Sequence, residues 1–354
     1  MIDHERTVTT LGNSPDLETL RQELDRVCSE IEADGATGEE LGIEPSAELQ
    51  HLEDLSLDQD PNLGVGRDHE PPVVPAVRYV TTEDAVSIAH YAVGSGDVDL
   101  VYVPGWISNI DVMWEHECYR RVFAHGAEHM RTVMMDKRGI GVSDAFERAP
   151  TADERIADIL AVLDATGLDR VAVSGHSEGG LMAQIFAERH PERVEKLVLS
   201  CSLVPKHVVP LAESLGGPNH RTYQETLPEW LEILDTWGVD PMPSVRLIHP
   251  SRVDDEAFAR WNVRFARSAA SPTQFARQIE SVAALTEESS PERIEAPTLV
   301  VHLSHDRAVG VGNGRALAQL IPNSTYLEVE GTDHFWITQE NWREVMDPEI
   351  EFVT

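Results

Sequence analysis

Lysine, cysteine and long hydrophobic runs are scarce in this sequence of 354 residues. The three cysteines, Cys28, Cys118 and Cys201, are scattered, and no Cys-x-x-Cys pair or Cys/His cluster accompanies them. We therefore expect reduced thiols with a structural role and no zinc site. A glycine-rich phosphate loop of the P-loop type is also absent, so the sequence predicts no cofactor.

The longest apolar runs fall well short of the roughly 20 residues that a membrane-spanning helix needs. The first residues, Met1 to Thr7, are not followed by the apolar segment that a secretory signal contains. These two absences lead us to expect a cytoplasmic protein without a membrane partner.

Acidic residues greatly outnumber basic ones. There are 62 Asp and Glu against 28 Lys and Arg, which gives a formal net charge of −34. Three of the basic residues are Lys and the other 25 are Arg. Such a surface repels nucleic acid and anionic membranes, so we exclude both as partners and expect a small-molecule substrate.

Residues 1–75 are predicted to form an acidic N-terminal extension. A helix is expected over about 14–34, because Ser14 can cap it and Pro15 suits its first position. Apolar residues recur there at spacings of three and four, at Leu17, Leu20, Leu24, Val27 and Ile31. This narrow seam packs either on the main domain or on the same helix of another subunit, which would give a homo-oligomer. The segment after it is typical of a linker or a wrapping arm.

The rest of the chain alternates short apolar strands with helical segments, which predicts an α/β fold with a mainly parallel, doubly wound sheet flanked by helices. The expected strands cover residues 77–80, 86–92, 99–103, 132–135, 171–173, 194–200, 297–303 and 325–329. The alternation stops over 203–290, where helical stretches and three Trp occur, so we expect an inserted helical cap there. The core domain then comprises residues 76–202 and 291–354.

A strand, a glycine-flanked turn and a helix surround Ser177. The turn, Gly175-His176-Ser177-Glu178-Gly179, matches the G-x-S-x-G pattern that holds a nucleophilic serine on a strained bend. A serine hydroxyl is a poor nucleophile at neutral pH, so it needs a base, and the base needs an acid that orients it.

The acid and the base are expected in loops that follow strands, at the same sheet edge as Ser177. Asp306 follows the strand that ends at Leu303, and His334 follows the last strand. The chain order Ser177, Asp306, His334 is the order found in α/β-hydrolases. His305 is a competing base that we rank below His334.

Two backbone N–H groups are expected to bind the oxyanion of the reaction. One belongs to Glu178, the residue after the nucleophile. The other is assigned to Trp106 in the turn Pro104-Gly105-Trp106, because Pro104 has no N–H. The Trp106 indole either lines the pocket or belongs to the core. The Glu178 side chain lies either near the mouth of the site or in solvent at the helix start.

Residues from about 76 to 346 resemble an α/β-hydrolase. Three stretches carry the resemblance: Val103 to Trp114, Met135 to Asp144 and Ser177 to Gly180. They are similar to the α/β-hydrolase domain often found with bacterial adenylate-cyclase domains. The resemblance implies an eight-stranded sheet, a cap after the sixth strand and ester-type hydrolysis. The chain holds no cyclase domain, and its acidic extension falls outside the family pattern.

A serine nucleophile favours attack on a carbonyl carbon. Members of the fold that open epoxides or displace halides resemble this chain at Gly105-Trp106 but carry Asp where Ser177 stands. We therefore expect a serine carboxylesterase or lactonase that acts on an apolar substrate of medium size, a class that includes aromatic and macrocyclic esters. Two alternatives stay open: a C–C bond hydrolase with the same triad, and a non-catalytic ligand sensor or scaffold.

The helix expected over 14–34 gives one testable prediction about assembly. If its apolar seam joins subunits, deletion of residues 1–70 lowers the particle mass that light scattering measures to that of a single shortened chain. An unchanged number of subunits after the deletion contradicts the prediction.

Overall fold

The computed structural model describes residues 75–354 except 222 and 240–242. Apart from Pro75, the predicted acidic extension and its helix lie outside the described residues. Among the described residues, no helix combines the length and the apolarity needed to cross a membrane.

The core of the molecule is an eight-stranded sheet with the strand order β1-β2-β4-β3-β5-β6-β7-β8. Only the β1–β2 and β2–β4 pairs are antiparallel, and the other neighbouring strands run parallel. The prediction of a mostly parallel eight-stranded sheet is therefore confirmed. The strands are β1 (Arg78–Thr81), β2 (Ser87–Val93), β3 (Val98–Val103), β4 (Met130–Met135), β5 (Val171–His176), β6 (Val194–Ser200), β7 (Thr298–Leu303) and β8 (Ser324–Val329).

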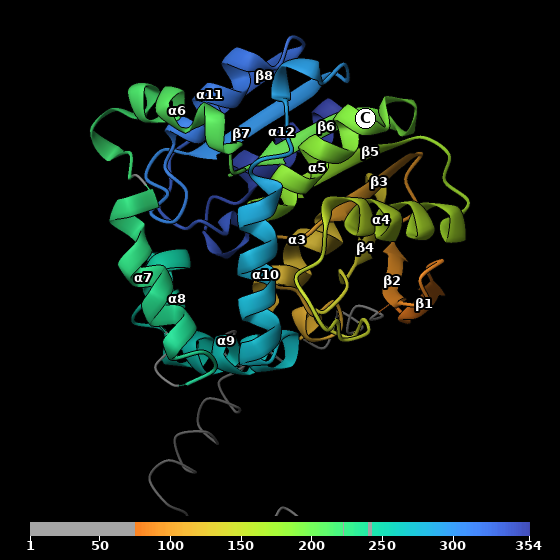
Figure 1. Ribbon diagram of the computed structural model, residues 1–354, viewed down its shortest axis with the longest axis horizontal. Coiled ribbons are helices and arrows are strands. Elements are labelled where there is room, and N and C mark those ends of the chain that lie inside the picture. The colour runs from red at the N-terminus through yellow and green to blue at the C-terminus, as the bar shows by residue number, and fades with distance from the viewer. Residues whose placement is uncertain (1–74, 222, 240–242) are drawn as a thin grey trace, which may run out of the picture. The chain divides into compact units, whose positions relative to one another are not determined.

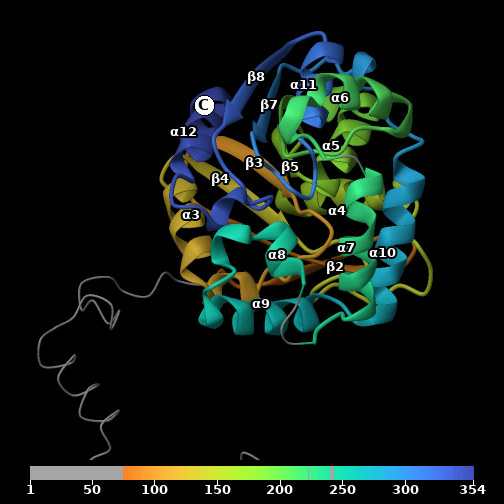
Figure 2. The ribbon, with the colours of Figure 1, turned by 90° about the vertical axis from the view of Figure 1, so that its left-hand side faces the viewer.

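Helices cover both faces of this sheet (Figures 1 and 2). One face packs against α4 (Ala152–Thr166), α5 (Glu178–Arg189) and α11 (Gly312–Leu320). The other face packs against α3 (Glu117–Ala127) and α12 (Arg343–Val353). Each face has its own buried apolar cluster, because alternate side chains of the central strands point to opposite sides.

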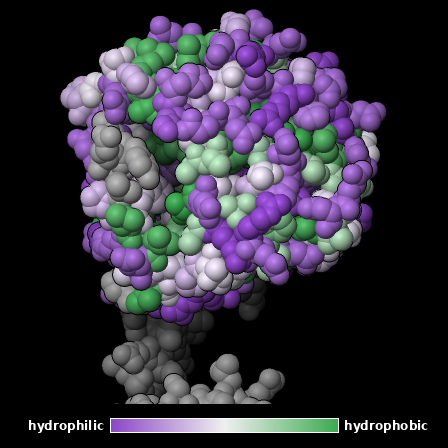
Figure 3. Space-filling view, in the orientation of Figure 1, coloured by the Kyte–Doolittle hydropathy of each residue, from purple (hydrophilic) through white to green (hydrophobic). Residues whose placement is uncertain are grey.

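Between β6 and β7 the described residues form helices and no strand. These helices are α6 (Val209–Gly216), α7 (Tyr223–Asp235), α8 (Ser244–Ile248), α9 (Glu256–Ala269) and α10 (Pro272–Leu285). The first of them, α6, packs on α11 of the core, whereas α7 to α10 enclose a third apolar cluster. The face in Figure 3 is mainly hydrophilic, and hydrophobic side chains gather over α7, where Leu231 is exposed.

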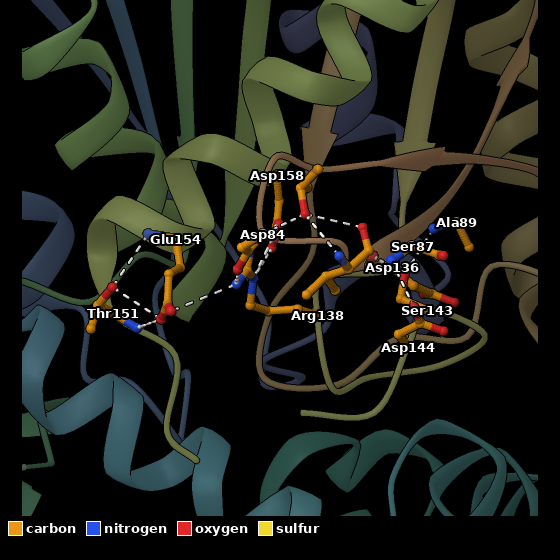
Figure 4. A network of polar contacts seen from close by, with 12 residues as sticks. Asp84, Ser87, Ala89, Asp136, Arg138, Ser143, Asp144, Thr151, Glu154 and Asp158 are labelled. Carbon is orange, nitrogen blue, oxygen red and sulfur yellow. Dashed lines mark hydrogen bonds and ion pairs between the residues drawn. The ribbon is translucent and has the colours of Figure 1, made fainter. Parts of the chain in front are cut away.

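The loop that follows β4, residues 136–144, is held by buried charges (Figure 4). The fully buried guanidinium of Arg138 forms an ion pair with Asp158 of α4 at 2.6 Å and another with Asp84 at 2.7 Å. Asp136 accepts hydrogen bonds from the Ser108 hydroxyl at 2.6 Å and the Val142 N–H at 2.9 Å. These contacts fix both neighbours of Lys137.

Glu349 of α12 is a buried carboxyl whose described partner is the Ser174 hydroxyl, which donates a hydrogen bond of 2.5 Å. Burial raises the pKa of Glu349 to about 7, because the hydrogen bond only partly compensates the charged form. A carboxyl that binds its proton more tightly in the folded state makes the free energy of unfolding fall as the pH rises from about 4.5 through about 7.

Replacement of this carboxyl by an amide removes that penalty. For Glu349→Gln we expect a stability close to wild type at pH 5 and a gain of up to about 3 kcal/mol at pH 8. Urea unfolding at the two pH values measures the difference. The exposed neighbour Glu351 provides a matched control, since Glu351→Gln should give no pH-dependent gain. Equal unfolding midpoints for wild type and Glu349→Gln at pH 8 would contradict the prediction.

Candidate active site

Ser177 lies in a strained turn between β5 and α5. Its backbone has φ 56° and ψ −122°, a conformation that residues with a side chain rarely adopt. Hydrogen bonds hold the turn from both sides: the Ser177 N–H donates to the Ser200 carbonyl at 2.9 Å, and the Ser177 carbonyl accepts from Gly180 at 3.0 Å. The bend places the hydroxyl at the carboxyl end of β5 and at the N-terminus of α5.

The two glycines of the pattern are required by close backbone contacts. A Cβ atom on Gly179 would lie 2.2 Å from the Val103 carbonyl oxygen. A Cβ atom on Gly175 would lie 2.6 Å from the Gly179 oxygen and 2.7 Å from the Ala183 side chain. Any other residue at either position would therefore push α5 away from the sheet and displace Ser177.

The structure brings Ser177, His334 and Asp306 into one hydrogen-bonded chain. The Nε2 atom of His334 lies 2.7 Å from the Ser177 hydroxyl oxygen, and its Nδ1 atom lies 2.7 Å from an Asp306 carboxylate oxygen. All three side chains are buried, and each comes from a loop at the carboxyl end of a different parallel strand: β5, β7 and β8. In this geometry Nε2 can accept the serine proton while Nδ1–H donates to Asp306.

Asp306 is held as a carboxylate by its surroundings. Its other oxygen accepts the backbone N–H groups of Ala308 at 2.9 Å and Val309 at 3.0 Å. Burial disfavours the charge, but His334, its hydrogen bond and the Val309 N–H outweigh burial and keep the pKa of Asp306 below its ordinary value. The group is therefore ionised at neutral pH and can orient His334.

The competing base His305 lies outside this chain of contacts. Its ring contacts the Ser304 hydroxyl at 2.7 Å and Glu330 at 3.2 Å. Asp333, the residue before His334, is fully buried. It accepts hydrogen bonds from the Ser251 N–H at 2.8 Å and the Thr338 hydroxyl at 2.8 Å, so it ties the His334 loop to the segment after α8.

Of the two predicted oxyanion donors, Trp106 lines the same cavity as Ser177, whereas Glu178 is not among the described residues that line it. The Glu178 N–H is the first of α5, and such N–H groups have no acceptor within their own helix. Trp106 follows Gly105, whose position for a Cβ atom is 3.4 Å from the Ser177 Cβ. The Trp106 indole does two things at once: it lines the cavity and packs edge-on against Trp230, with 4.9 Å between ring centroids.

The Glu178 side chain lies neither at the mouth of the site nor in solvent, contrary to both expectations. It points inward, is 2 % exposed and forms ion pairs with Lys137 and with Arg155 of α4. The Lys137 ammonium also donates a hydrogen bond of 2.6 Å to the Gly105 carbonyl. Burial lowers the pKa of Lys137 to about 8, although Glu178 opposes this shift. Sequence reasoning missed this buried ion cluster, formed by Lys137, Glu178 and Arg155.

The cavity in front of Ser177 has a volume of about 40 Å³ and carries no Lys, Arg, Asp or Glu among the described residues that line it. Its wall includes the aromatic side chains of Trp106, Tyr119, Phe265 and Phe335. Two further histidines, His176 and His249, also line it. Burial holds the pKa of His176 far below its ordinary value and lowers that of His249 to about 3, so both rings are neutral at pH 7.

Two other histidines between β6 and β7, His207 and His220, do not line this cavity. His207 is exposed, and the ring of His220 accepts the backbone N–H of Gly312 at the start of α11.

The contact between Asp306 and His334 predicts the outcome of an amide substitution. In Asp306→Asn the amide can present an N–H to Nδ1, which favours the ring tautomer with its proton on Nε2, so that Nε2 no longer accepts from Ser177. We expect the rate at which a fluorophosphonate probe labels Ser177 to fall by about 10⁴-fold with little change in melting temperature. His305→Gln serves as the control and should change the rate less than about threefold. If the probe labelled Ser177 in Asp306→Asn as fast as in wild type, the role of Asp306 as the residue that orients His334 would be contradicted.

Comparisons with known proteins agree with this architecture. A 2-hydroxy-6-oxononadienedioate/2-hydroxy-6-oxononatrienedioate hydrolase of Burkholderia vietnamiensis is 28% identical over 285 residues, which are 78% of this chain and 95% of that protein. Epoxide hydrolase 1 of Caenorhabditis elegans is 25% identical over 243 residues, which are 60% of this chain and 56% of that protein. This chain therefore matches little more than half of the epoxide hydrolase.

The crystal structure of an esterase from Rhodococcus sp. superposes with a TM-score of 0.61 and 21% identity, covering 78% of this chain and 99% of the esterase. At this identity the likeness establishes the fold alone. The family model for the alpha/beta hydrolase fold matches residues 100–340, more than half of the chain. With the strand order and the Ser177 turn described above, this match shows that the chain belongs to the alpha/beta hydrolase fold family.

Proposed function

We propose that the protein is a serine hydrolase that cleaves a neutral carboxylic ester or lactone through an acyl-enzyme. The observation that carries the proposal is the buried hydrogen-bonded chain from Asp306 through His334 to the Ser177 hydroxyl. Ser177 is the nucleophile, His334 is the general base and then the general acid, and Asp306 orients and stabilises the protonated ring.

In the first half of the reaction, His334 Nε2 takes the hydroxyl proton while the Ser177 oxygen bonds to the substrate carbonyl carbon. The carbonyl oxygen becomes negative and accepts hydrogen bonds from the N–H groups of Trp106 and Glu178. Collapse of this tetrahedral species breaks the bond to the leaving alcohol, which receives the proton from His334. Ser177 then carries the acyl group.

In the second half, a water molecule replaces the alcohol. His334 accepts a proton from the water as its oxygen attacks the acyl carbon, and the same two N–H groups bind the new oxyanion. Release of the carboxylic acid returns the proton to Ser177. With a lactone the leaving alcohol and the acid belong to one molecule, and the bonding changes are the same.

The cavity supports a neutral substrate with a short acyl part. No described lining residue offers a cation, and the neutral rings of His176 and His249 do not supply one, so a buried substrate carboxylate would lack a charged partner. A volume of about 40 Å³ leaves room for a small acyl group beside Ser177.

A C–C bond hydrolase is the second candidate, because the Burkholderia vietnamiensis relative is named for that class of substrate. A dienedioate carries two carboxylates, and such a ligand would place charge in a cavity without a matching cation. The described lining therefore favours ester or lactone cleavage over this alternative.

Hydrolysis of a chromogenic ester series tests the proposal. We expect p-nitrophenyl acetate to be cleaved with a higher kcat/KM than the octanoate ester, and Ser177→Ala to lose at least about 10³-fold of that activity without losing its fold. A fluorophosphonate probe should label wild type and leave Ser177→Ala unlabelled.

Turnover retained in Ser177→Ala would refute the assignment of the nucleophile. An unreactive wild type that binds small esters would support the non-catalytic sensor instead. Cleavage of a dienedioate but no ester would favour the C–C hydrolase.

A further inference from the structure

We propose that Lys137 is a positioning residue that aims the oxyanion donors by holding the carbonyl of Gly105. This inference rests on the proposed function, since it assigns a role to a residue beneath the same site. The Lys137 side chain does not line the cavity, and it reaches Gly105 and Glu178 from the buried side.

The contact between Lys137 and Gly105 acts on a single peptide group. The C=O of Gly105 and the N–H of Trp106 belong to the same planar trans peptide unit, so they point in opposite directions. The Lys137 ammonium donates to the Gly105 oxygen at 2.6 Å. With that oxygen fixed toward the protein interior, the Trp106 N–H is fixed toward the cavity and Ser177. Free rotation of the peptide unit would turn the N–H away from the oxyanion.

The second donor is tied to the same ammonium. The N–H of Glu178 is the other oxyanion donor, and the carboxylate of Glu178 pairs with Lys137. A single nitrogen atom, Nζ of Lys137, therefore contacts two segments that are far apart in the chain. These are the turn after β3 and the start of α5. A shift of about 1 Å between donor and oxyanion is enough to weaken catalysis by about 100-fold.

Lys137 can serve as a fixed reference because its neighbours in the chain are anchored (Figure 4). Arg138 pairs with Asp158 of α4, and Asp136 accepts the N–H of Val142 and the Ser108 hydroxyl. The backbone on both sides of Lys137 is therefore held to other elements. A long, flexible lysine side chain gains a defined position when its root and its tip are both constrained.

The buried ion cluster contains a second cation, Arg155. Comparing its loss with the loss of Lys137 distinguishes a positioning role from an effect of charge alone. Arg155 is as buried as Lys137 and pairs with the same carboxylate, Glu178. Its described ion pair is with Glu178, whereas Lys137 also contacts the Gly105 carbonyl. Loss of either cation removes one positive charge and leaves Glu178 with one partner. Loss of Lys137 alone frees the Gly105–Trp106 peptide group.

The test compares Lys137→Met with Arg155→Met in the full chain. For Lys137→Met we expect kcat for p-nitrophenyl acetate to fall by about 10- to 100-fold, below the loss caused by deleting an oxyanion donor, while KM changes less than about threefold. The rate of Ser177 labelling by a fluorophosphonate should fall by a similar factor. Arg155→Met should lower both rates several-fold less than Lys137→Met, because Glu178 keeps Lys137 as a partner and the Gly105 carbonyl stays held. Circular dichroism and melting temperatures verify that both variants fold.

Lys137→Gln carries the same test if the Met variant does not fold. Its neutral amide nitrogen stands one bond short of the ammonium, so it cannot hold Gly105 and Glu178 together as the ammonium does, and the same loss of kcat is expected. Equal losses in the Lys137 and Arg155 variants would overturn the proposal in favour of a pure charge effect. Wild-type rates in a folded Lys137 variant would also overturn it.

The labelling rate separates this inference from the proposed function. A wild type that the probe does not label contradicts the nucleophile itself, and the positioning role falls with it. A wild type that is labelled quickly but hydrolyses no ester contradicts only the proposed substrate, and the ratio of labelling rates between wild type and Lys137→Met still decides the role of Lys137.

Discussion

The positive φ of Ser177 is the constraint on which the rest of the site depends. A residue with a side chain in this region costs of order 1–3 kcal/mol, and it persists only where the surroundings leave no alternative. Here β6 binds the Ser177 N–H, and the first turn of α5 binds its carbonyl. Glycine at 175 and 179 lets the helix approach the sheet closely enough for both contacts. Because these contacts hold the Ser177 backbone at positive φ, its hydroxyl faces the cavity.

Charges buried beneath this turn are difficult to explain by stability alone. The ion pairs of Arg138 with Asp158 and of Lys137 with Glu178 are almost fully removed from water. The desolvation of such pairs offsets much or all of their attraction, so packed apolar side chains would often be as stable. Hydrogen-bonded ion pairs differ from apolar contacts in being directional. A positional role for Lys137 gives a reason why this chain keeps charge where leucine would suffice.

The sequence was most informative where function follows from strand order. Parallel strands end at one edge, so a serine, an acid and a base that each follow a strand were expected to meet, and Ser177, Asp306 and His334 lie in contact. The prediction for the Glu178 side chain was wrong because the residues that pair with it have no fixed spacing in the sequence. Lys137 and Arg155 lie 41 and 23 residues before it, on a loop and a helix whose approach only the packed fold defines.

The large negative charge of the chain makes the oxyanion harder to stabilise, so its two N–H donors must bind it more strongly. A formal charge of −34 creates a field that opposes any further negative charge, the tetrahedral oxyanion included. Salt screens the exposed acids over about 8 Å at physiological ionic strength, whereas buried groups near the reacting carbon are screened much less. The groups near the reacting carbon must therefore stabilise the oxyanion by more than the distant acidic residues destabilise it. Two N–H dipoles aimed by a buried ammonium meet this requirement only while their direction is held, because the energy of a dipole depends on its angle as well as its distance.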